Sequence, residues 1–153
     1  PLQQPRPVER QRSRDRRAQL VGALLLGGIV AAEGPRSPGL TAVLESASCP
    51  NILVKVSGFY YGSRTEWDFP FADAIEVVRA LYEQYGARRL AWGSDYPVVT
   101  RAMTYRQAME VVRSHCPFID EADQGWLMGG TVSHLLEHGL RREEPSPASR
   151  PAP

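Results

Sequence analysis

The residue best placed to do chemistry is Asp95, in the segment WGSDYP from Trp92 to Pro97. An apolar strand is predicted over 90–93, and Asp95 follows where that strand would end. At the carboxyl end of a parallel strand, an Asp can bind a divalent metal, take a proton from a metal-bound water, or do both. The small Gly93 would share a face with Asp95 and leave space beside the carboxylate. The competing interpretation is an Asp that only forms a turn or caps a helix.

A second set of candidate residues accompanies the strand predicted over 52–56. Lys55 and Ser57 would lie on one face of that strand. If this face is the interior of a closed barrel, Lys55 is buried and needs a carboxylate partner, for which Asp95 is the candidate. Alternatively, Lys55 or Ser57 contacts a substrate. The aromatic loop predicted after the strand, which includes Tyr60, can line a substrate mouth or simply pack. We therefore take Lys55, Ser57 and Tyr60 as candidate substrate-binding residues.

The elements that must position these residues alternate between strand and helix. Apolar spacing predicts helices over 40–48, 71–85, 104–115, 119–128 and 131–138. Units of roughly 30–40 residues indicate βα repeats around a parallel sheet.

The apolar run LVGALLLGGIVAA, from Leu20 to Ala32, allows two interpretations. One is a buried strand over 21–26. The other is a secretory signal peptide over 16–32, with Arg16 and Arg17 as a twin-arginine pair. The run continues toward the next predicted helix without a cleavage-type break, which favours the strand.

Composition indicates one ordinary domain and excludes several partners. The chain has 153 residues and a net charge of +1, which gives no general attraction to nucleic acid or an anionic membrane. No apolar run reaches the length of a membrane span. The two cysteines lack CxxC spacing and are predicted to be reduced thiols, in keeping with a cytoplasmic protein. Residues 1–19, rich in Arg and Pro, and 141–153, rich in Pro and Ser, are predicted to be disordered, which leaves 20–140 as the folded domain.

Two longer stretches carry a resemblance to a known family. They are NILVKVSGFYYG (51–62) and YGARRLAWGSDYPVV (85–99). Their Pro-Asn lead-in, Lys-x-Ser-Gly, Gly-x-x-Arg and Trp-Gly-Ser-Asp-x-Pro features resemble the amidohydrolase-related (amidohydrolase-2) family of metal-dependent barrel enzymes. The ending GGTVSHLLEHG is similar to that family's last Gly-rich turn and helix, with Thr131 in place of the usual Asn. The resemblance covers roughly 40–139.

The resemblance implies the C-terminal part of a (β/α)8 TIM barrel, about strands 6–8 with their helices, incomplete as given. It implies that Asp95 is the catalytic carboxylate and a metal ligand or neighbour, and that the full-length family uses a divalent metal such as zinc. The implied site also needs histidines on earlier strands. All three histidines here follow Asp95, and Leu25 stands where the sixth strand often has His. We therefore expect no assembled metal site in this chain alone, and we interpret His134 and His138 as surface residues.

Two hypotheses about function follow. The first is the C-terminal part of a metal-dependent hydrolase or decarboxylase whose substrate is a small organic acid, lactone or amide. The second is a truncated or inactive homologue without catalysis of its own. Both allow a homo-oligomer, and neither involves nucleic acid or a membrane.

Overall fold

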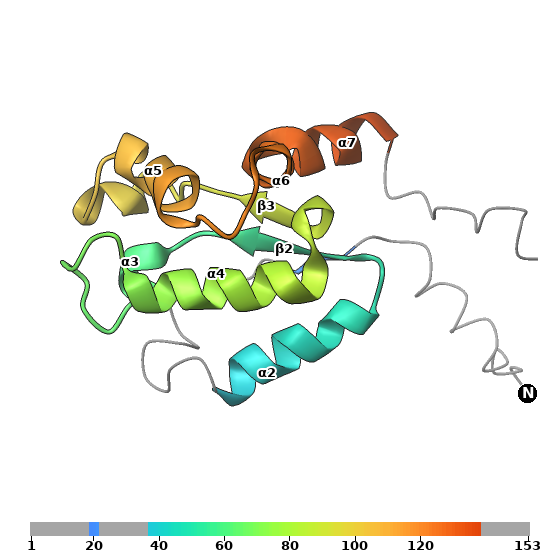
Figure 1. The fold of residues 1–153 in the computed structure, drawn as a ribbon, viewed down its shortest axis with the longest axis horizontal. Helices are drawn as coiled ribbons and strands as arrows, with labels where there is room; N and C mark the ends of the chain where they lie inside the picture. The colour runs from blue at the N-terminus through green and yellow to red at the C-terminus, as the bar shows by residue number, and fades with distance from the viewer. Residues whose placement is uncertain (1–18, 22–36, 139–153) are drawn as a thin grey trace, which may run out of the picture.

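The computed structural model describes residues 19–21 and 37–138. Strands β1 (Gln19–Val21), β2 (Ile52–Val56) and β3 (Leu90–Trp92) form a parallel sheet in the order β1-β2-β3. Their register pairs Val21 with Val54 and Val54 with Leu90. In Figure 1, β2 and β3 run side by side in the same direction and α4 lies alongside them. The predicted parallel α/β arrangement is confirmed for these residues.

The N-terminal boundaries differ from the prediction. β1 begins at Gln19, one residue before the predicted start of the domain, and shares only Val21 with the strand predicted over 21–26. Residues 22–26 lie outside the described residues, as do Leu25 and nearly all of the predicted terminal segments.

Helices occupy most of the remaining described chain. Before β2 lie α2 (Pro38–Glu45) and the 3-10 helix η3 (Ser46–Ser48). Between β2 and β3 lie α3 (Phe59–Gly62), α4 (Ala72–Tyr85) and the 3-10 helix η4 (Ala87–Arg89). After β3 come the 3-10 helix η5 (Val98–Arg101), α5 (Tyr105–His115), α6 (Glu121–Gly125), the π-helix η6 (Trp126–Gly130) and α7 (Thr131–His138).

Local side-chain chemistry explains several helix ends. Thr104 and Gln107 form a capping box at the start of α5. Asp120 caps α6 by accepting a hydrogen bond from the Asp123 backbone N–H at 2.8 Å. Gly86 ends α4 with a φ of 67°, a conformation that glycine adopts without steric cost.

One helix was not expected. α3 lies inside the segment predicted to be a loop over 59–70, and it makes a single turn closed by Gly62 N–H to the Gly58 carbonyl at 3.0 Å. A helix of four residues carries too little apolar periodicity to be recognised in a sequence.

The sheet has two faces with different roles. Val54, Val56 and Leu90 are at most 1% exposed and join one apolar cluster with residues of α2, α4, α5 and η6. Lys55 and Ala91 alternate with these residues and so point to the opposite face. The helix-covered face stabilises the fold, and the opposite face carries the candidate site.

The start of α7 is hydrogen-bonded to η4, the 3-10 helix that leads into β3. Thr131, at the start of α7, is buried and donates from its hydroxyl to the Ala87 carbonyl at 3.1 Å. Within the described ranges, no helix combines the length and the apolar character needed to cross a bilayer.

Candidate active site

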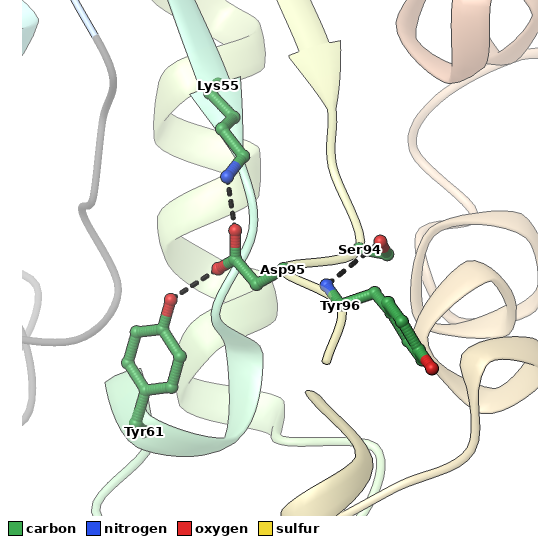
Figure 2. A network of polar contacts seen from close by, with 5 residues as sticks. All are labelled: Lys55, Tyr61, Ser94, Asp95 and Tyr96. Carbon is green, nitrogen blue, oxygen red and sulfur yellow. Dashed lines mark hydrogen bonds and ion pairs between the residues drawn. The ribbon is translucent and has the colours of Figure 1, made fainter. Parts of the chain in front are cut away.

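The carboxyl ends of β2 and β3 meet at one edge of the sheet. The ladder continues one residue past β3, where Gly93 N–H donates to the Val56 carbonyl at 3.0 Å. Asp95 then takes a left-handed backbone conformation, with φ of 54°, which Asp tolerates better than most residues. Figure 2 shows its side chain turned back toward β2. The carboxylate is therefore aimed by this turn, and not by the strand alternation with Gly93 from which we expected its direction.

Asp95 forms the ion pair that the sequence predicted. Its Oδ1 accepts a hydrogen bond from Lys55 Nζ, and the two side chains are 13% and 33% exposed respectively. Gly93 makes room for this contact, because a Cβ atom at position 93 would overlap Cε of Lys55. Lys55 is thus paired in register with Ala91 of β3 and lies over Gly93, which follows the strand.

The other carboxylate oxygen has a partner from the aromatic loop that we did not select as a site residue. Oδ2 of Asp95 accepts a hydrogen bond from the phenol of Tyr61, on α3 (Figure 2). Tyr60, the tyrosine that we selected, is buried instead, and its phenol donates to the Val98 carbonyl at 3.3 Å. No sequence signal separated Tyr61 from Tyr60, because the one-turn helix after Gly58 that directs these two adjacent residues to different places is too short to be recognised in a sequence.

These contacts determine the protonation of both partners. Burial acts to raise the pKa of Asp95, but the hydrogen bonds from Lys55 and Tyr61, together with the charge of Lys55, lower it below its ordinary value. Burial, then the hydrogen bond to Asp95 and its charge, raise the pKa of Tyr61 far above the ordinary value. At neutral pH the site therefore holds a carboxylate between an ammonium group and a neutral phenol.

Ser57 is a buried hydroxyl beside this group. It is 1% exposed, and its Oγ has no hydrogen-bond partner among the described residues. It lies close enough to Asp95 and Tyr61 to lower the pKa of both. A serine hydroxyl can rotate to donate or accept, so Ser57 keeps unused hydrogen-bonding capacity, although its Oγ has almost no exposed surface in this structure.

A small hollow opens beside the carboxylate, between the segments that follow β2 and β3. Its lining includes Tyr60, Tyr61, Ser94, Asp95 and Val99. Two of the predicted site residues, Asp95 and Tyr60, therefore line the same hollow.

The loop between α3 and α4 is fastened by Asp73. Its carboxylate accepts hydrogen bonds from the Ser63 hydroxyl at 2.7 Å, the Arg64 backbone N–H at 2.7 Å and the Ala74 backbone N–H at 2.9 Å. Burial acts to raise the pKa of Asp73, but these bonds outweigh it and lower the pKa. Asp73 thereby connects the rim of the site to the first turn of α4.

Asp73→Asn is expected to lower the free energy of unfolding by about 1 kcal/mol near neutral pH, because the variant loses a charge at a helix N-terminus and charge-assisted hydrogen bonds. A carboxyl group whose folded-state pKa is depressed stabilises the fold above its unfolded-state pKa, and this contribution disappears as pH falls through the folded-state value. The difference between wild type and variant should therefore begin to shrink below the ordinary Asp pKa of 3.8 and be lost once the pH lies below the lowered folded-state pKa. Urea titrations across pH measure it. Asp68→Asn, on an exposed carboxylate of the same loop, is the control, and an equal effect of both variants would contradict the role of Asp73.

The described residues do not fit a metal ion by themselves. Zinc sites use three or four protein ligands, and no group of three His, Cys, Asp or Glu residues that could hold an ion occurs within 19–21 and 37–138. Both oxygens of Asp95 already accept hydrogen bonds. His134 and His138 are exposed on α7, with their rings stacked 4.6 Å apart, as expected for surface residues.

Parallel strands joined by helices, with polar side chains gathered at the carboxyl ends, are the features of α/β enzymes that place their sites on strand-following loops. Comparison with known proteins specifies the class. The model of the amidohydrolase family (Amidohydro_2) matches residues 26–131, more than half of the chain, and the chain belongs to that family. This is a family of TIM-barrel hydrolases.

Three relatives illustrate the likeness. An L-fucono-1,5-lactonase from Burkholderia ambifaria is 43% identical over 60 residues, which are 37% of this chain and 19% of the lactonase. A zinc-bound amidohydrolase from Burkholderia multivorans matches with a TM-score of 0.59 and 25% identity, over 71% of this chain and 40% of that protein. A protein assigned as a 2-pyrone-4,6-dicarboxylic acid hydrolase from Pseudomonas putida matches with a TM-score of 0.57 and 28% identity, over 72% of this chain and 40% of that protein. The chain thus spans well under half the length of each.

Proposed function

We propose that this chain supplies the last three βα units of an amidohydrolase barrel that hydrolyses a lactone or a similar small cyclic ester. The observation that carries the proposal is the ionised Asp95 carboxylate at the carboxyl edge of the sheet, held by Lys55 and Tyr61 beside a hollow. The lactonase among the relatives supports a lactone over an amide, and it supports hydrolysis over decarboxylation.

In this proposal Asp95 is the general base. It accepts a proton from a water molecule whose oxygen attacks the lactone carbonyl. The ring C–O bond then breaks, and the alkoxide oxygen that leaves takes the proton back from Asp95. The hydroxyl group of the water is thereby added to the acyl carbon and its other hydrogen to the former ring oxygen, so the product is a hydroxy acid. Because the pKa of Asp95 is lowered, the carboxylate is ionised at neutral pH, which is the form that a general base requires.

The other predicted site residues have distinct places in the proposal. Lys55, one-third exposed, offers positive charge to Asp95 and to negative charge that develops on the substrate. Ser57 has a free hydroxyl with which to orient the attacking water. Tyr60 lines the hollow as part of its wall.

The metal and the partners belong to the proposal as well. A divalent ion, such as the zinc bound by the Burkholderia multivorans amidohydrolase, would need ligands beyond the described residues, and Asp95 would have to give up a hydrogen bond to bind it. The proposed partner is a small-molecule substrate, and a homo-oligomer is compatible with the proposal.

A hydrolysis screen tests the proposal. Sugar 1,5-lactones and a pyrone dicarboxylate are offered to this chain and to any longer product of the same gene, and acid release is followed with a pH indicator. We expect turnover of at least one lactone. If no product of the gene hydrolyses any of these esters, the inactive homologue becomes the better interpretation.

A further inference from the structure

Tyr61 contacts Asp95 through a directed hydrogen bond to one carboxylate oxygen, and not only through packing. The carboxylate has one donor on each oxygen, Lys55 from β2 and Tyr61 from α3. A charged donor on one oxygen and a neutral donor on the other leave the carboxylate little freedom to rotate about its Cβ–Cγ bond. The titratable groups that face Asp95 among the described residues are these two, and Tyr60 lies edge-on to Tyr61 at 4.9 Å between ring centroids.

The backbone before Tyr61 is shaped to admit its ring. Gly58 precedes α3 with a φ of 75°, and a Cβ atom at that position would overlap the ring of Tyr61 around its phenol end. Position 58 is thus restricted both by its left-handed backbone and by the ring that crosses it. The turn after β2 therefore brings the Tyr61 phenol to the carboxylate.

We propose that Tyr61 is a positioning residue for the reaction, which holds Oδ2 of Asp95 from α3 while Lys55 holds Oδ1, so that the general base has one orientation beside the hollow. This inference rests on the proposed lactone hydrolysis. Tyr61 acts through Asp95, and the proposed roles of Lys55, Ser57 and Tyr60 do not depend on it.

Tyr61→Phe removes one oxygen atom and keeps the ring. We expect kcat for the lactone to fall about 10–100-fold, since small displacements of a reacting group carry penalties of this size, with KM changed less than about threefold. At pH 7 the ¹³Cγ NMR signal of Asp95 should move in this variant. Tyr82→Phe is the matched control, because it removes a phenol-to-carboxylate hydrogen bond of 2.6 Å, to Asp123, outside the site.

A reciprocal measurement does not need the Tyr61 variant to fold. In protein labelled with [¹³Cζ]tyrosine, Asp95→Asn should move the Tyr61 signal and leave that of Tyr82 in place, and Asp123→Asn should do the reverse. Unchanged carbon signals at Tyr61 and Asp95, or an unchanged kcat in an active enzyme, would overturn the inference. Absence of lactone turnover in the wild type contradicts the proposed function instead, and the carbon signals report on the contact in either case.

Discussion

Asp95→Asn is expected to lower kcat/KM for lactone hydrolysis by about 10²–10⁴-fold, because an amide cannot accept the proton that a general base removes from water. Asparagine is close to aspartate in size and tolerates a φ of 54°, so the backbone turn at position 95 should persist. Steady-state rates on the lactone found in the screen measure the effect, and circular dichroism verifies the fold.

The matched control for this variant is Asp123→Asn. Asp123 accepts a hydrogen bond from Tyr82, just as Asp95 accepts one from Tyr61, but it lies on α6 outside the site. We expect its kcat/KM to stay within about twofold of wild type, as for other surface changes away from the chemistry. Wild-type rates in Asp95→Asn would remove Asp95 from the mechanism.

Leu81→Ala should cause the largest loss of stability, about 2–5 kcal/mol in the free energy of unfolding. Leu81 is 0% exposed, on the buried side of α4, in the cluster that also holds Val54 and Leu90. Truncation removes apolar contacts and leaves a cavity that packed neighbours fill only in part. Urea unfolding followed by circular dichroism provides the measurement.

Leu136→Ala is the control for that prediction. Leu136 lies on α7 and is 81% exposed, so its truncation should change the free energy of unfolding by no more than about 0.5 kcal/mol. Equal losses for the two variants would show that α4 does not pack on the sheet as described.

Most of the elements around the site could be predicted from the sequence. The strand over 52–56 was predicted with its bounds, and the helices over 71–85, 104–115 and 131–138 differ from the observed ones by at most one residue at each end. These elements have strong apolar periodicity or clear caps, which are local properties of the chain. The pairing of Lys55 with Asp95 was one of the two interpretations of Lys55, because a lysine on the inner face of a parallel strand needs a carboxylate partner.

The side chains that complete the site could be assigned only from the folded chain. β3 ends at Trp92, and the left-handed backbone at Asp95 turns its carboxylate back toward β2. The one-turn helix α3 sends Tyr61 to the carboxylate and Tyr60 to the Val98 carbonyl. A single residue in an unusual backbone conformation changes the direction of its own side chain and of the chain that follows. Such turns depend on contacts between segments far apart in the chain, and those contacts leave no periodic pattern in the sequence.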